Sequence, residues 1–373
     1  PIPAYGHSKS RRYDLKQMVL LLAKTGASHF PIWMEAHSGN ASDQKTMPTA
    51  AAKINQLCKE LKDAQDFLYI GDSAMYANIL ACSDQIQWLT RVPERLSEAR
   101  LLVSGAYEDS TWTTLDENYS YLATTSNHKS VPQRWVLFFS QAAYVQEIKT
   151  LETTIAKEYA AQNKVWRALS NKILKDSEDL KAQAPQTMLK YHKVDYYIVS
   201  VQKHTGTGRP KEGVLPETIG YRLEYTLVPD ERLIQAARSR RGLFILATNH
   251  LNSESPSEAQ LLQEYKNQSG VESGFKFIKD DTFQVDSVFL KNPSRIAALL
   301  MIMSLCLMVY GTMEYHLHQE LVKTGDTIPN ALKKPTKKPS LKWVFIIFRV
   351  LNEVHMVNHG KVTKIVANLN VVL

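Results

Sequence analysis

The 373-residue sequence has few of the features that mark specialised protein classes. Its three cysteines, Cys58, Cys82 and Cys306, are far apart and form no CxxC pair, which argues against a disulfide framework and a zinc site. We interpret them as small buried side chains in a reducing compartment. The apolar run at 296–311 is short for a bilayer span, which needs about 20 residues. We therefore expect a fully buried helix there and no membrane partner.

Basic residues outnumber acidic ones and are grouped along the chain. The 45 Lys and Arg against 37 Asp and Glu give a net charge of +8 and an isoelectric point near 9.1. Runs of basic side chains occur at 8–12, 238–241 and 333–338. A solvated surface explains any single run, whereas three runs favour a polyanionic partner such as a DNA backbone.

The first part of the chain alternates between predicted strands and helices. An antiparallel hairpin is expected within 13–36, with its turn around Gly26. A helix from about Asp43 comes next, followed by a strand at 66–73, a second helix and a strand at 85–92. This order is typical of an α/β domain in which helices flank a sheet.

The middle of the sequence follows a different pattern. A strand at 134–140 precedes a long helix at 141–182, which Pro185 ends. The segments 196–203 and 220–228 have the composition of two paired strands. We interpret this block as an α+β insertion in the α/β domain.

The α/β pattern then resumes with a strand at 242–249 and continues as helices to about residue 315. A Lys/Pro linker leads to a last predicted helix at 340–354. The predicted organisation is a first part of the α/β domain at 1–95, the insertion at 96–240, a second part at 241–315 and a C-terminal helical extension at 316–373.

Two carboxylates are candidate metal ligands. Asp72 follows an apolar strand, at the edge where α/β sheets place ligands, and burying a carboxylate there is costly unless it is paired. On a continuous helix, at about 100° per residue, Tyr265, Gln268, Glu272 and Lys279 form one polar stripe beside an apolar face. The alternative is a half-exposed amphipathic helix with a Glu on its rim. Oxygen ligands from Asp72 and Glu272 would suit a divalent cation.

The same residues match a family pattern. The chain resembles bacterial insertion-sequence DDE transposases, whose last catalytic acid lies in a Tyr–Arg–Glu–Lys signature. Tyr265, Glu272 and Lys279 fit the spacing of that signature, and Gln268 stands where the family has Arg. Other stretches similar to the family run nearly from end to end: YGHSKSRRYDLKQ (5–17), HSGNASDQKTM (37–47), FLYIGDSAMY (67–76), WLTRVP (88–93), TGRPK (207–211) and KKPTKKPSLKWVF (333–345).

The resemblance implies a ribonuclease-H-like mixed sheet with flanking helices, interrupted by the insertion. Asp72 matches the second catalytic acid and Glu272 the third, 272 − 72 = 200 positions later. The family's first acid lies on a strand upstream of the YGHSK-like stretch, so we expect that first strand and its Asp to precede Pro1. The chain as given is then expected to be inactive, and two strands should lack their central neighbour. Asp14 matches an Asp of the family that is not catalytic.

The implied chemistry is metal-dependent DNA cleavage and strand transfer, with two Mg²⁺ or Mn²⁺ ions about 3.5–4 Å apart. Asp72 and Glu272 would be their ligands. The implied partners are terminal inverted repeats and target DNA, bound by a homodimer on paired ends in the bacterial cytoplasm, associated with the nucleoid. The residues implied to contact DNA are Tyr265, Gln268, Lys276, Lys279, Lys9, Arg11, Arg12 and Lys16. For each basic residue taken alone, a solvated position is an equally good interpretation.

Three other interpretations stay open. A non-enzymatic, DNA-binding remnant of a transposase shares every basic feature and needs no complete set of acids. An integral membrane protein anchored by 296–311 is disfavoured by the length of that run. A metalloenzyme using His316 and His318 is disfavoured because residues two apart on a helix point in different directions.

Overall fold

The structure is a computed structural model, in which the chain divides into two units. Unit 1 comprises Pro1–Thr90, Lys129–Val131 and Thr248–Leu373, and unit 2 comprises Arg91–His128 and Pro132–Ala247. The described residues are 2–7, 12–26, 28–60, 67–80, 83–105, 112–186, 188–204, 215–252, 256–268, 271–272, 274–275, 292–330, 332–348 and, for the backbone, 351–358 and 361–368.

The fold is mixed α/β and ribonuclease-H-like, and its main element is a six-stranded mixed sheet with the order β3-β4-β10-β7-β6-β5. β3 and β4 are parallel, whereas β5 and β6 are antiparallel. Apolar side chains at the centre of β7, including Val136 and Phe138, are fully buried. The strands are β3 (Leu68–Gly71), β4 (Gln87–Arg91), β5 (Thr113–Thr114), β6 (Tyr119–His128), β7 (Val131–Ser140) and β10 (Leu243–Thr248).

In unit 1, the predicted hairpin is confirmed as the antiparallel pair β1 (Met18–Lys24) and β2 (Pro31–Ser38). These two strands form a sheet of their own, and β3 is an end strand of the larger sheet. Among the described strands, β1 pairs only with β2, and β3 pairs only with β4. The helices of this unit are α1 (Asp43–Glu60), α2 (Ser73–Ile79), α7 (Glu258–Asn267), α9 (Pro293–Thr324) and α10 (Leu341–Phe348).

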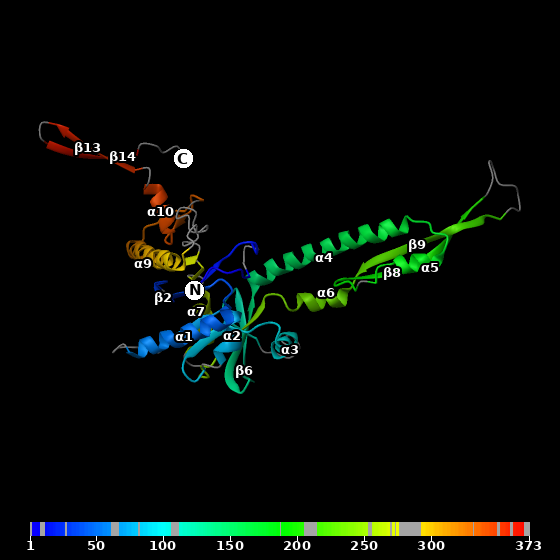
Figure 1. Cartoon of the computed structure of the whole chain (residues 1–373), viewed down its shortest axis with the longest axis horizontal. Helices are drawn as coiled ribbons and strands as arrows, with labels where there is room; N and C mark the ends of the chain where they lie inside the picture. The colour runs from blue at the N-terminus through cyan, green and yellow to red at the C-terminus, as the bar shows by residue number, and fades with distance from the viewer. Residues whose placement is uncertain are drawn as a thin grey trace. The chain divides into compact units, whose positions relative to one another are not determined.

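In unit 2, α4 (Gln141–Ser170) and α5 (Ser177–Gln183) pack along the antiparallel hairpin of β8 (His192–Lys203) and β9 (Glu217–Pro229), as Figure 1 shows. The core of this region is formed by large apolar side chains, and Trp166, Leu180 and Leu223 are buried in it. The predicted strand pair is thereby confirmed. The unit also contains α3 (Ser97–Gly105) and α6 (Glu231–Arg238).

The single long helix predicted at 141–182 is wrong, because α4 ends at Ser170. Leu174 exchanges two backbone hydrogen bonds with Tyr221 of β9, at 3.0 and 2.7 Å, and this bridge draws the chain out of the helix. Asp176 then caps α5 by accepting the Glu178 N–H at 2.9 Å. The interruption thus comes from pairing with a distant strand.

The C-terminal part also departs from expectation. The helix predicted at 340–354 ends at Phe348, and Leu351–Asn358 forms β13, paired with β14 (Lys361–Asn368). The sequence LNEVHMVN shows no regular alternation of apolar and polar residues, so its pattern does not mark it as a strand. The short strand β11 (Ile328–Pro329) precedes the Lys/Pro linker and pairs with β12 (Pro335–Thr336), which lies within it.

The predicted fully buried helix at 296–311 is also wrong. α9 is 32 residues long, and one face packs on unit 1 through Leu300 and Leu307, whereas Val309 on the other face is 62% exposed. Among the described residues, this one helix is long and apolar enough to cross a membrane by length and composition alone, and 28% of its most apolar window is buried. Cys306 on this helix is exposed rather than buried, Cys58 is partly exposed, and Cys82 lies outside the described residues.

Candidate active site

Asp72 lies where the sequence places it, directly after β3, and it begins α2. Its backbone is extended, with φ −77° and ψ −179°, and its Oδ1 accepts the Ala74 N–H at 2.9 Å. The Thr90 hydroxyl of β4 donates to the Asp72 carbonyl oxygen at 2.7 Å. The parallel neighbour strand and the helix cap therefore fix the backbone and orientation of an exposed carboxylate at the carboxyl end of the sheet.

The helix predicted to carry Tyr265, Gln268, Glu272 and Lys279 as one stripe is shorter than expected. α7 begins with a capping box between Ser257 and Gln260 and ends with Gln268 as its C-cap. Val271 N–H donates to the Gln268 carbonyl at 2.9 Å, and helix is described again at 271–272 and 274–275. The predicted continuous stripe is therefore wrong for the described residues, and a Gln-Ser-Gly sequence follows α7 where the cap lies.

The segment with Glu272 is docked by the residues that follow it. Phe275 packs against the buried pair of Leu22 on β1 and Leu307 on α9. Gly274 is buried, and a Cβ added there would lie 3.1 Å from Leu22 and 3.3 Å from Leu307. The absence of a side chain at Gly274 thus permits close packing, while Glu272 itself is exposed.

A cavity of about 440 Å³ connects the two segments that carry the predicted acids. Ile70 of β3 and Val271 both line it, together with Gln268 and Lys24. Side chains two apart on a strand point to the same face, so Asp72 leaves the extended chain on the side of Ile70. Glu272 is the residue after Val271. The two acids therefore belong to segments that meet at one cavity.

Two basic side chains, Lys24 and His29, line this cavity together with the Glu264 carboxylate. Burial lowers the pKa of Lys24, and the nearby Glu314 carboxylate partly opposes that change. Burial also lowers the pKa of His29, and the positive charge of Lys24 adds to the effect. Both changes favour the neutral forms of these side chains inside the protein.

The carboxylates of Asp72 and Glu272 have the oxygen atoms that suit a hard divalent cation, but two carboxylates are fewer than the three in the family's site. Asp72 and Glu272 both offer carboxylate oxygens, the ligands that Mg²⁺ and Mn²⁺ prefer. Across the part of the chain that the structure describes, no group of three or more His, Cys, Asp or Glu could hold a metal ion. His318, weighed above as a metal ligand, lies with its Nε2 2.8 Å from the Pro339 carbonyl oxygen.

Of the eight residues expected to contact DNA, the structure describes four. Arg12 forms two hydrogen bonds with the Asp14 carboxylate, at 2.9 and 2.8 Å, so a phosphate would have to compete with that pair. Lys16 Nζ lies 5.8 Å from the centre of the Tyr5 ring. Tyr265 and Gln268 are half-buried, and Gln268 faces the cavity. Lys9, Arg11, Lys276 and Lys279 lie outside the described residues.

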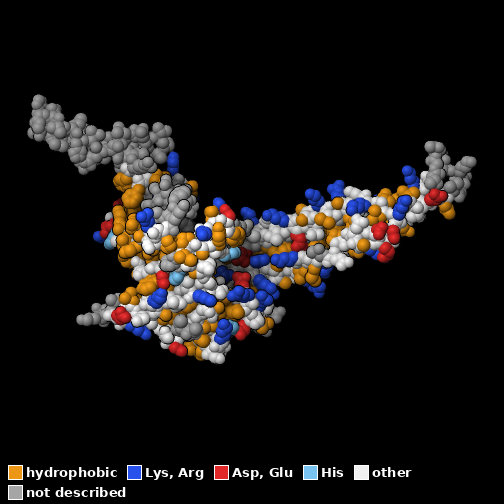
Figure 2. Space-filling model, in the orientation of Figure 1, with side chains coloured by type: hydrophobic (Ala, Val, Ile, Leu, Met, Phe, Trp, Pro, Cys, Tyr) orange, Lys and Arg blue, Asp and Glu red, His pale blue; other side chains and the backbone are white. Residues whose placement is uncertain are grey.

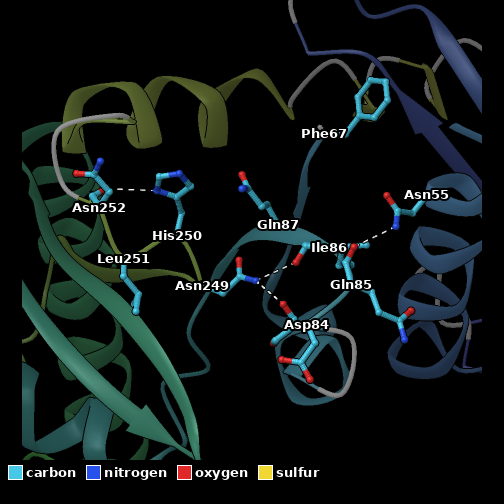
Figure 3. A pocket seen from close by; sticks show the side chains of 11 residues that line it. Asn55, Phe67, Asp84, Gln85, Ile86, Gln87, Asn249, His250, Leu251 and Asn252 are labelled. Atoms are coloured by element: carbon cyan, nitrogen blue, oxygen red, sulfur yellow. Dashed lines mark hydrogen bonds between the residues drawn. The ribbon is translucent and has the colours of Figure 1, made fainter. Parts of the chain in front are cut away.

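A second cavity, of about 560 Å³, lies at the amino ends of β3 and β4, the opposite end from Asp72. Figure 3 shows Asn249 beside the segment before β4, where its Nδ2 donates to the carbonyl oxygens of Ser83 at 2.9 Å and Ile86 at 2.8 Å. Its Oδ1 accepts the Trp88 N–H at 3.0 Å. Sequence reasoning missed this residue, although an Asn directly after an apolar strand was visible in ATN.

Comparison with known proteins identifies a family for this chain. No curated protein and no solved structure matches the chain. A family model described as a transposase DDE domain matches residues 1–309, which is most of the chain. The matched range includes β3 with Asp72 and the segment with Glu272. The chain therefore belongs to the transposase DDE domain family.

Proposed function

We propose that this chain derives from an insertion-sequence transposase whose catalytic acids include Asp72 and Glu272. Membership of the DDE family supports DNA strand cleavage and transfer as the reaction class. The observation that supports the residue assignment is the shared cavity, because it is lined by Ile70, two residues before Asp72, and by Val271, the residue before Glu272. The proposal includes the assignment of Tyr265, Glu272 and Lys279 to the Tyr–Arg–Glu–Lys signature, with Gln268 in place of the Arg.

Asp72 and Glu272 are the proposed ligands for two Mg²⁺ or Mn²⁺ ions. Such ions activate an attacking oxygen and stabilise the leaving oxygen in phosphodiester cleavage. Asp72 contributes a carboxylate that is held in place by its bond to Ala74 N–H and by Thr90. Glu272 contributes from a segment anchored by Phe275. A preset ligand lowers the entropy lost when a cation binds.

The proposed DNA contacts extend from this site along both of its segments. Tyr265, Gln268, Lys276 and Lys279 would position the phosphate near the acids, because charged and polar side chains fix the register of a DNA backbone. The stretch with Lys9, Arg11, Arg12 and Lys16 would extend the phosphate track. Of these, Arg12 contributes only after it leaves Asp14.

We further propose that the polypeptide as given does not cut DNA, because the resemblance supplies only two of its three acids. The partners of the complete enzyme would be terminal inverted repeats and target DNA, held by a homodimer on paired ends in the bacterial cytoplasm, at the nucleoid. A second candidate is a DNA-binding remnant without metal chemistry, which is supported by the three basic runs and needs no complete set of acids.

Counting bound Mn²⁺ by electron paramagnetic resonance separates these two candidates. Asp72→Asn keeps the N-cap, since Asn and Asp cap helices equally well, so the fold should be retained. We expect Asp72→Asn and Glu272→Gln each to weaken Mn²⁺ binding at least about tenfold, as expected when a charged ligand is lost. Asp84→Asn is the matched control, because Asp84 is an exposed acid at the opposite cavity.

The same proteins are incubated with Mg²⁺ or Mn²⁺ and terminal-repeat DNA. The expected result is DNA binding without cleavage. Cleavage that Asp72→Asn abolishes would show that another residue replaces the first acid, and the proposal of inactivity would then be wrong. DNA binding with no Mn²⁺ effect in either variant would favour the remnant.

A further inference from the structure

The exposed face of α9 carries an apolar stripe. At about 100° per residue, Val309 and Met313 lie within about 20° of the line through Ile302, with Leu305 and Cys306 on either side. Ile302 is 56% exposed and Val309 62% exposed. Figure 2 shows hydrophobic side chains gathered over α9 and α10. Contiguous apolar surface on a helix of a folded unit is typical of an interaction site.

The other sides of α9 are already occupied within unit 1. Leu300, Met303 and Leu307 are buried on the packed face, and the Ser304 hydroxyl contacts the Met34 sulfur of β2. α10 covers a neighbouring side, where the Lys342 N–H donates to the Tyr310 hydroxyl oxygen at 2.8 Å. The stripe is therefore a third face that none of these contacts uses.

Charges at the two ends of the stripe are complementary to one another. Arg295 and Glu320 are both exposed and lie within about 20° of the line through Ile302. In an antiparallel pair of α9 helices centred between Leu307 and Met308, residues whose numbers add up to 615 face each other. Arg295 then meets Glu320 of the second copy, and Ile302 meets Met313. A parallel pair would instead bring like charges together, and its helix dipoles would repel.

The length of α9 also suits a paired helix. Its 32 residues rise about 48 Å, and the apolar stretch from 301 to 313 accounts for about 18 Å of that length. The exposed apolar positions 302, 305 and 309 follow the spacing of three and four that allows two helices to interlock. A lipid surface would need no opposite charges at matched ends of the stripe.

We infer that this stripe is the interface through which two copies of the chain associate, with α9 packed antiparallel against α9. The inference names the contact for the homodimer of the proposed function and rests on that proposal for its role at paired DNA ends. The association itself requires neither metal nor DNA. It can therefore fail or succeed independently of the assignment of Asp72 and Glu272.

Sedimentation equilibrium of the full chain without DNA tests the inference. The parent is expected to form dimers, and Val309→Asp should raise the dimer dissociation constant at least about tenfold by placing a charge in the apolar contact. Val145→Asp is the matched control, since Val145 is 58% exposed on α4 in unit 2 and should leave the constant unchanged. A monomeric parent at high concentration, or a dimer indifferent to Val309→Asp, would overturn the inference.

Charge exchange tests the antiparallel register. Arg295→Glu and Glu320→Arg should each weaken the dimer several-fold, and the double variant should restore it. In an equimolar mixture of chains carrying Arg295→Cys or Glu320→Cys, each with Cys306→Ser because Cys306 is exposed on the stripe, disulfide-linked heterodimers should exceed homodimers. The α9 pair would be refuted if the double variant dimerised more weakly than either single variant. It would also be refuted if the protein stayed monomeric and bound to phosphatidylcholine vesicles.

Discussion

The Asn249 side chain offers a sharp test of how the sheet next to the candidate site is held. One amide group makes three hydrogen bonds, at 3.0, 2.9 and 2.8 Å, to the backbone of Trp88, Ser83 and Ile86. A protein hydrogen bond contributes about 0.5–1.5 kcal/mol net, so Asn249→Ala should lower the free energy of unfolding by about 3 kcal/mol. Trp88 is fully buried, so its N–H would lose its partner away from solvent.

Urea unfolding followed by tryptophan fluorescence measures this change. Asn249→Asp is a second variant, because it retains the acceptor for Trp88 but places a carboxylate against two carbonyl oxygens, and it should cost at least as much. Gln85→Ala is the control, since the backbone carbonyl of Gln85 accepts from Asn55 and substitution leaves that bond intact. A loss below about 1 kcal/mol for Asn249→Ala, or a neutral Asn249→Asp, would refute the reasoning.

Burial raises the pKa of Glu158, but hydrogen bonds from His192 and two backbone N–H groups lower it more, so the net pKa of Glu158 is lowered in the folded protein. The stability that the ionised Glu158 contributes is therefore lost as pH falls below 4.5, the pKa of Glu in the unfolded chain. Glu158→Gln should flatten that acid dependence in urea unfolding. Burial raises the pKa of Tyr69 to about 12, so this side chain should lower stability between pH 10 and 12, and Tyr69→Phe should remove its share of the fall in thermal unfolding. Gly242 has φ +73°, and an added Cβ would lie 2.9 Å from the Ser140 carbonyl oxygen. Gly242→Ala should therefore cost about 2 kcal/mol in urea unfolding, whereas Gly105→Ala, with open space around it, should not.

Local patterns predicted the first elements of unit 1, from β1 to α2, because their signals are local. Alternation identified β1 and β2, and a short apolar run ending in Asp72 identified β3 and the start of α2. An Asp that follows a strand and accepts from a helix N–H is a short-range feature that needs no tertiary contact. The candidate site was accessible to sequence reasoning for the same reason.

Some failures involve contacts distant in sequence, and others involve local signals that are weak or unusual. The interruption after Ser170 depends on the pairing of Leu174 with Tyr221, and helical periodicity carries no sign of that bridge. The strand β6 was missed because the turn before β7 uses Lys129 and Ser130, both with positive φ, instead of the usual Asn-Gly. Apolar composition alone could not reveal that only one face of α9 is covered.

The arrangement around Asp72 separates two demands on one carboxylate. Asp72 uses its Oδ1 to cap α2, where it accepts the Ala74 N–H. A metal ligand needs a carboxylate oxygen that is directed to solvent. The same side chain can cap the helix and bind a cation only if its backbone is held in place. The Thr90 bond to the Asp72 carbonyl supplies that restraint from the parallel strand. Glu272 has no such cap, and its position depends on packing by Gly274 and Phe275 against β1 and α9. A shift of α9 would therefore displace Glu272 more than Asp72. In this way the proposed dimer surface on α9 is coupled to the position of one of the two proposed metal ligands.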